Sequence, residues 1–188
     1  MEPDWFTPET TVGLIALSGG REGDVGRALL SGHRRLAEQR LDAWRKLFGD
    51  RYYLQLVRTG RSDEEDCLHA SVELAAAHAV PVVATNGVCF LQPQEFAAHE
   101  VRVCIHEGRT LDDPRRLKSY SDQQYLRSPT EMVELFSDVP EALANSVEIA
   151  KRCNLEITRG GRYLADLPTP APRTLAAVFR AGSRDALD

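Results

Sequence analysis

Short apolar runs alternate with longer amphipathic stretches along this chain. Residues 12–17, 52–57 and 81–85 form short runs rich in branched or aromatic side chains, and polar or glycine residues follow each run. Runs of this length and composition are typical of buried β-strands. The sequence therefore predicts a strand at each of these places.

The stretches between the runs predict helices. A helix is predicted over residues 33–48, and it should end at Gly49. Its broad apolar face consists of Leu36, Leu41, Trp44, Leu47 and Phe48. Ser62 and Glu65 have the spacing of a capping box, so Ser62 should open a second helix that runs to about His78.

The second half of the chain predicts further helices. Pro93 fits the first turn of a helix that ends at Gly108. Ser128 and Glu131 form a capping box around a first-turn proline. Residues 140–153 predict a last helix, with an apolar side made of Leu143, Val147 and Ala150.

Strands and helices thus follow one another in turn, and residues 155–158 predict one more short strand. Residues 52–85 read as a βαβ unit, in which a helix joins two parallel strands. This alternation predicts an α/β fold with a parallel sheet.

Charge and size narrow the possible functions. The chain has 188 residues, which fits one domain with a core of its own, and its formal net charge is −5. Because most nucleic-acid affinity comes from basic side chains on phosphates, we expect no autonomous DNA binding. Arg115, Arg116 and Lys118 form a small basic cluster, but Asp112 and Asp113 adjoin it, so a solvated loop is expected there.

The expected cellular compartment rests on the sequence lacking a membrane span and a signal peptide. Its apolar runs all fall short of the roughly 20 residues of a membrane span. The first ten residues lack the basic-then-apolar layout of a signal peptide. Reduced thiols in the cytoplasm are therefore expected at the widely separated cysteines, Cys67, Cys89, Cys104 and Cys153.

Four stretches carry a resemblance to a known family. They are residues 12–27, 50–69, 81–111 and 119–154, and within the last one QYLRSPTEMVELFSDVPEALANSVEIAKRC is the most specific. Together they resemble the alpha subunit of bacterial DNA polymerase III, in the later part of its N-terminal polymerase-and-histidinol-phosphatase (PHP) domain. The resemblance implies a partial, distorted seven-stranded β/α barrel, similar to a TIM barrel.

The resemblance also implies a division of the chain. Residues 1–168 would be a truncated PHP domain, because the family's His-x-His or His-x-Asp strand belongs upstream of anything in this sequence. Residues 169–172 read as a proline-containing linker, and residues 173–188 as a divergent tail.

Metal ligands of the family are degenerate in this sequence. Metal-dependent members carry a cysteine after the first of these strands, where Gly20 stands here. They carry Asp-x-His after the strand at 81–85, where this chain has Gly87 and Cys89. Since glycine has no side-chain donor and one thiol does not make a site, we expect no metal centre and no cofactor.

The histidines do not supply another metal site. His99 and His106 are seven residues apart on one helix, about 10.5 Å along its axis, whereas zinc–nitrogen bonds are roughly 2 Å. His69 and His78 point in different directions on their helix, and His33 stands alone. Capping, packing or exposure is the expected role of these side chains.

Carboxylates and glycines offer no other chemistry. The family's polymerase palm carries Asp-x-Asp, which does not occur in these 188 residues. The adjacent Asp112 and Asp113 would point to opposite faces of a strand, and the acidic triplet that starts at Glu64 is explained by helix capping. The turn that starts at Ser18 lacks the spacing of a phosphate-binding loop.

The favoured hypothesis is a non-catalytic structural and interaction module that acts in DNA replication. Its implied partners are the rest of the polymerase alpha subunit and, in some bacteria, the proofreading exonuclease subunit. The family is a DNA-directed DNA polymerase, a nucleotidyltransferase, but the palm is missing from this chain. The alternatives are a metal-dependent phosphoesterase of the PHP family and a gene fragment without function.

Overall fold

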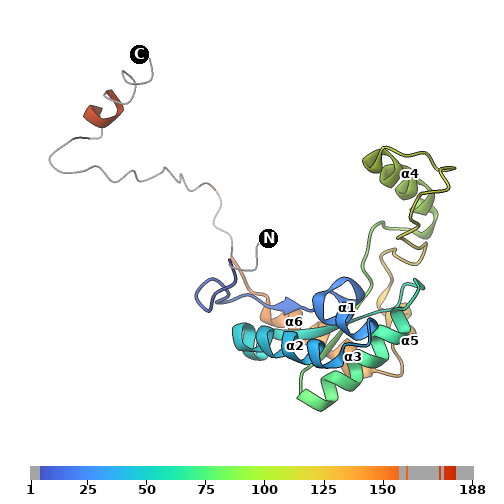
Figure 1. Cartoon of the computed structure of the whole chain (residues 1–188), viewed down its shortest axis with the longest axis horizontal. Helices are drawn as coiled ribbons and strands as arrows, with labels where there is room; N and C mark the ends of the chain where they lie inside the picture. Colours follow the sequence, from blue (N-terminus) through green and yellow to red (C-terminus); the bar gives the residue numbers. More distant parts are fainter. Residues whose placement is uncertain (1–4, 157–159, 161–173, 175, 181–188) are drawn as a thin grey trace. The chain divides into compact units, whose positions relative to one another are not determined.

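The computed structural model describes residues 5–156, 160, 174 and 176–180. The chain divides into two compact units, Met1–Cys153 and Asn154–Asp188. The first unit contains a parallel sheet and the helices packed on it (Figure 1). In the second unit the described residues include a short helical segment at 176–180.

Three parallel strands in the order β1-β2-β3 form the sheet of the described residues. They are β1 (Ala16–Leu17), β2 (Tyr52–Val57) and β3 (Val82–Thr85). Ala16 pairs with Tyr52, and Leu54 pairs with Val82. The predicted α/β class and its βαβ unit at β2 and β3 are confirmed. The described residues show this small sheet and not a seven-stranded barrel.

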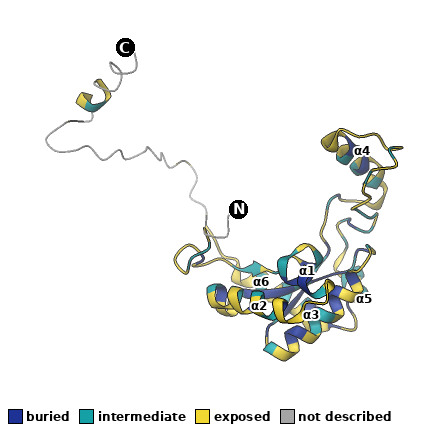
Figure 2. Ribbon diagram, in the orientation of Figure 1, coloured by how far each residue is buried: buried dark blue, intermediate teal, exposed yellow. Residues whose placement is uncertain are grey.

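The helices of the first unit pack on the sheet or on one another, except for the one at Phe96–Glu107, which contacts mainly the 3₁₀ turn before it. They are α1 (Asp24–Leu30), α2 (Arg34–Phe48), α3 (Glu64–His78), α4 (Phe96–Glu107), α5 (Pro129–Leu135) and α6 (Pro140–Arg152). Short 3₁₀ turns lie at Gly20–Glu22, Gly49–Arg51 and Pro93–Glu95. α3 contacts β2, and α6 contacts β3. The most buried residues follow the sheet and the helix faces next to it (Figure 2), including Val25, Leu41, Leu54, Leu56, Leu74 and Phe136.

The predicted strands differ in how well they match. Residues 52–57 form β2 with the predicted bounds, and β3 begins one residue after the predicted start at 81. The strand predicted at 12–17 is reduced to Ala16–Leu17. Gly13 has a φ of 76° and the Leu14 amide donates to the Thr11 carbonyl, so a turn occupies the first half of that run. As a result Val12 is 73% exposed instead of buried.

One predicted helix cap is wrong and another is confirmed. The N-cap of α3 is Asp63, in the left-handed conformation at φ 61° and without a capping side-chain bond. Ser62 does not cap this helix, and its hydroxyl and carbonyl oxygens both accept hydrogen bonds from the Arg21 guanidinium. At α5 the Ser128 hydroxyl accepts from the Glu131 amide, and the Glu131 carboxylate accepts from the Ser128 amide, as the capping box requires.

The predicted helix faces are partly wrong. In α2, Leu41 is fully buried as expected, but Leu36 is 39% exposed and Ala37 takes its place in the core. In α6, Val147 is 54% exposed and Ala150 is also exposed. The prediction is confirmed for Leu143, which packs against the core. Ala142 and Asn145 lie on the same side of α6, where the Asn145 side chain donates to the Val82 carbonyl at 2.8 Å.

Other predictions concern the ends of elements. The helix expected from Pro93 is present as a 3₁₀ turn followed by α4, and Gly108 closes it at φ 63°. The strand predicted at 155–158 is not formed at residues 155–156, where Leu155 is 85% exposed, and residues 157–158 lie outside the described residues. Within the described residues, each helix is too short or too polar to cross a membrane.

Candidate functional site

The carboxyl ends of the three strands define the candidate site. Ser18 and Gly20 follow β1, Thr59 and Arg61 follow β2, and the segment from Asn86 to Cys89 follows β3. Parallel strands bring their carboxyl ends to one edge of a sheet, and ligands of open α/β sheets bind at this edge. The resemblance also places the family's metal ligands at the ends of the strands. We call this region the carboxyl edge.

A buried carboxylate organises the loop after β2. Glu64 is only 4% exposed. Its carboxylate accepts hydrogen bonds from the Thr59 amide at 2.6 Å, the Thr59 hydroxyl at 2.7 Å and the Arg61 Nε at 2.8 Å. Burial raises the pKa of Glu64, but these hydrogen bonds and the Arg61 charge outweigh it and hold the pKa below its usual value. Glu64 is therefore an ionised partner of Arg61, and its interpretation as a plain helix-capping residue is wrong.

Arg61 joins the loops that follow β1 and β2. Its Nη1 lies 2.9 Å from a carboxylate oxygen of Glu22, while its Nε lies 2.8 Å from Glu64. The Arg61 side chain is 16% exposed. A guanidinium thus lies between a carboxylate from each loop, and a second arginine, Arg21, donates to the Ser62 carbonyl nearby. The carboxyl edge is cross-linked by arginine.

The loop after β3 is held by amide hydrogen bonds. The Gln124 side chain donates to the Gly87 carbonyl at 3.1 Å, and the Cys89 amide donates to the Gln124 carbonyl at 2.8 Å. Asn86 donates to the Tyr125 carbonyl at 2.6 Å and accepts from the Arg127 Nε at 3.2 Å. These bonds dock the segment around residue 124 onto the end of β3.

The positions that the resemblance implies to be degenerate metal ligands all lie at this edge; they are Gly20, Gly87 and Cys89. Gly20 and Gly87 both have a φ of 54°, which L side chains rarely adopt, and a Cβ on Gly20 would come within 3.3 Å of Val57 Cγ2. Burial raises the pKa of the Cys89 thiol.

The histidines are distributed away from this edge. The His99 ring lies edge-on to Tyr120, with a centroid distance of 4.6 Å, and His78 Nε2 lies 3.9 Å from Glu38. His69 and His106 are exposed, and His33 precedes α2 without a side-chain cap bond. Across residues 5–156 and the other described positions, the structure forms no group of three or more His, Cys, Asp or Glu side chains that could hold a metal ion.

The basic cluster at 115–118 is not wholly solvated. Arg116 forms an ion pair with Glu100 of α4, and the side chains are only 6% and 10% exposed. Arg115 binds Asp113 at 3.0 Å. The prediction of a solvated loop is therefore wrong for Arg116, because a buried carboxylate on the neighbouring helix neutralises it. The Arg116–Glu100 and Arg61–Glu64 pairs were both missed from the sequence. Arg116 and Glu100 are 16 residues apart, whereas Arg61 and Glu64 are only three apart, so their spacing was a signal that could have been used.

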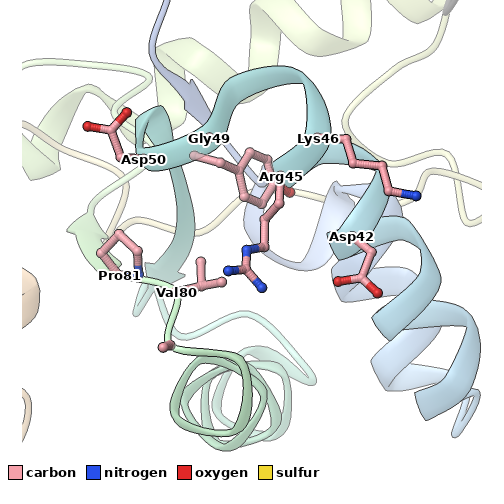
Figure 3. A pocket seen from close by; sticks show the side chains of 9 residues that line it. Asp42, Arg45, Lys46, Gly49, Asp50, Val80 and Pro81 are labelled. Atoms are coloured by element: carbon pink, nitrogen blue, oxygen red, sulfur yellow. The ribbon is translucent and has the colours of Figure 1, made fainter.

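A cavity of about 540 Å³ lies at the opposite edge of the sheet (Figure 3). Arg45 and Lys46 from α2 and Asp50 line it, and Val80 and Pro81 from the start of β3 close its other side. The Asp50 carboxylate forms an ion pair with Arg152, with 3.2 Å between Asp50 Oδ2 and Arg152 Nη2. Because this cavity faces the amino ends of β2 and β3, it does not share the geometry of a parallel-sheet active site.

Comparison with known proteins gives the family. The chain is 52% identical over all 188 residues to the DNA polymerase III subunit alpha of Pseudomonas aeruginosa. It is 56% identical over 169 residues to that of Escherichia coli K12 and 55% identical over 161 residues to that of Vibrio cholerae. The chain is homologous to a segment of the DNA polymerase III alpha subunit.

The match covers 100%, 90% and 86% of the chain but only 16%, 14% and 14% of these three alpha subunits. The chain therefore spans about one sixth of the length of the curated relatives it matches. No family model matches the chain. The recognition of the family from residues 12–154 is confirmed.

Proposed function

We propose that this chain is a non-catalytic structural and interaction module in the PHP region of the DNA polymerase III alpha subunit, and that it acts in DNA replication. Homology to alpha subunits supports the assignment to the replicative polymerase. The observation that carries the non-catalytic part is the Arg61 guanidinium, which lies between Glu22 and Glu64 at the carboxyl edge.

Electrostatics at this edge disfavours divalent metal ions. A metal would need the carboxylates that Arg61 already binds, and it would approach a fixed positive charge to reach them. Removing the partner of a buried charge costs about 3 to 5 kcal/mol, so exchange of the guanidinium for a metal would begin with that loss. Gly20 and Gly87 offer no donor side chains to compensate for it.

The same proposal covers the fold and the partners. The three parallel strands would be part of a larger, distorted β/α barrel of PHP type, completed by polypeptide that precedes this segment in the alpha subunit. The partners would be the rest of that subunit and, in some bacteria, the proofreading exonuclease subunit. With a net charge of −5, the chain would not bind DNA by itself, and it would act in the cytoplasm.

Two measurements test this proposal. First, a chimera of the Pseudomonas aeruginosa alpha subunit, with these 188 residues in place of the 188 that match, should extend primed DNA templates. Second, the purified chain should hold well under one equivalent of zinc or manganese by elemental analysis. Stoichiometric metal, together with chelator-sensitive hydrolysis of phosphomonoesters that Cys89→Ala abolishes, would replace the proposal with a phosphoesterase. A folded but inactive chimera would remove the replicative role.

A further inference from the structure

Helix α4 is packed on one side by the loop that follows it. Glu100 and Cys104 are 8% and 4% exposed. Arg116 of the loop binds the Glu100 carboxylate, and Tyr120 lies against His99 at 4.6 Å between ring centroids. These contacts use the face of α4 that carries residues 96, 99, 100, 103 and 104.

A second face of α4 is apolar and bare. Ala97, Val101 and Ile105 recur every four residues and so form one stripe along the helix. Val101 is 42% exposed and Ile105 is 74% exposed. Figure 2 shows exposed residues along α4. We call these residues the α4 stripe.

The sequence of α4 is that of a helix covered on two sides. Around its circumference, charged or imidazole side chains outside the packed face are confined to a narrow strip with Arg102 and His106, next to the stripe. A helix that meets only the loop would place polar residues where Val101 and Ile105 lie. Its pattern therefore points to a second contact surface.

We propose that the α4 stripe packs against polypeptide of the same alpha subunit that lies outside this chain. The inference rests on the proposed function. The chain is only 16% of the length of the Pseudomonas aeruginosa subunit, so more than four fifths of such a polypeptide is available to cover it. Arg102 borders the stripe and makes no ion pair within the described part of the chain, so a carboxylate on the covering surface would complement it.

The size of the stripe favours an intramolecular partner. A stable interface between separate proteins buries roughly 800 Å² and about 20 to 30 residues on each side. The α4 stripe offers two large side chains and one alanine, which is far less. Within one polypeptide a contact of this size suffices, because the loss of translational and rotational freedom does not have to be overcome again. A second copy or a separate subunit is therefore disfavoured.

Cysteine labelling tests the inference. Ile105→Cys is introduced into the isolated chain and into the full-length chimera with the Pseudomonas aeruginosa subunit, and His106→Cys in the polar strip is the matched control. Maleimide labelling is followed site by site by mass spectrometry. We expect the cysteine at 105 to react at least about tenfold more slowly in the chimera than in the isolated chain, because burial limits thiol reactivity. The cysteine at 106 should react at similar rates in both.

Each other outcome overturns the inference. Equal labelling at 105 in both proteins, in a chimera that still extends primers, would remove the docking surface and leave the proposed function intact. Protection in the isolated chain that increases with its concentration would assign the stripe to a second copy. Protection that requires added exonuclease subunit would assign it to that subunit. If the cysteine chimera fails to fold, hydrogen exchange of α4 in the unsubstituted chimera decides, since equal exchange in both proteins contradicts the docking.

Discussion

Replacing Glu64 with alanine should strongly destabilise the first unit of the chain. Its carboxylate is buried and accepts hydrogen bonds of 2.6, 2.7 and 2.8 Å from Thr59 and Arg61. Breaking a buried ion pair by removing one partner costs about 3 to 5 kcal/mol. Because Arg61 keeps Glu22 as a second partner at 2.9 Å, we expect the lower end, about 3 kcal/mol of unfolding free energy.

Urea unfolding of the wild-type chain and the Glu64→Ala variant, followed by tryptophan fluorescence, measures this loss. The slope against urea should stay the same while the midpoint falls. Glu65→Ala is the matched control, since Glu65 is 56% exposed and its partner Arg58 also binds Asp138 at 2.6 Å. An exposed pair of this kind contributes up to about 1 kcal/mol. If Glu64→Ala costs no more than Glu65→Ala, the buried pair does not hold the carboxyl edge together.

The difference in unfolding free energy between the wild type and Glu64→Ala should depend on pH, which gives a sharper test. The pKa of Glu64 is lowered in the folded chain, so its contribution is fully present above the ordinary value of 4.5. It is lost as the pH falls through the lower folded value, where the carboxylate takes up its proton. The difference in unfolding free energy between wild type and Glu64→Ala should therefore be constant near neutral pH and become smaller in acid. If this difference in unfolding free energy becomes larger in acid, the assignment of an ionised Glu64 is contradicted.

Three further predictions concern metal, association and packing. The double variant Gly87→Asp with Cys89→His should still bind well under one equivalent of zinc by elemental analysis, because too few ligands converge there. At high protein concentration the purified chain should associate in light scattering, since β1 is an edge strand of the sheet and its Leu17 is 41% exposed; a chain that stays monomeric there would contradict this. Asn145→Ala should cost about 1 kcal/mol in urea unfolding, because it removes the bond to the Val82 carbonyl.

Sequence patterns predicted best the elements that are buried along their whole length. Residues 52–57 are almost entirely buried, so an aromatic and branched run defines β2 at both ends. Residues 12–17 are also an apolar run, but Gly13 places a turn within it. Composition alone does not separate these cases, because the turn depends on one backbone angle and on the partner strand.

For the carboxyl edge, the sequence allowed only the prediction that metal ligands are absent, not a prediction of the ion pairs found there. Gly20 and Gly87 have no donor side chains, and the prediction that no metal binds rests on this. The arrangement that replaces them could not be inferred, since Arg61 reaches Glu22 across 39 residues of sequence. Glu64 also gave a misleading local signal, because an acidic residue in the first turn of a helix is ordinarily explained by the helix dipole.

The ion pairs at the carboxyl edge also bear on how the fold would tolerate the proposed loss of metal ligands. A metal cluster draws carboxylates from neighbouring loops together and neutralises them, and its loss would leave like charges at one edge. Arg61 performs both tasks for the loops after β1 and β2, because a guanidinium presents several donors in a fixed plane. Gln124 and Asn86 fix the loop after β3 without charge. The edge is therefore closed by side chains of the chain itself, as we expect of the structural module proposed above, whereas a catalytic metal site keeps an open coordination position.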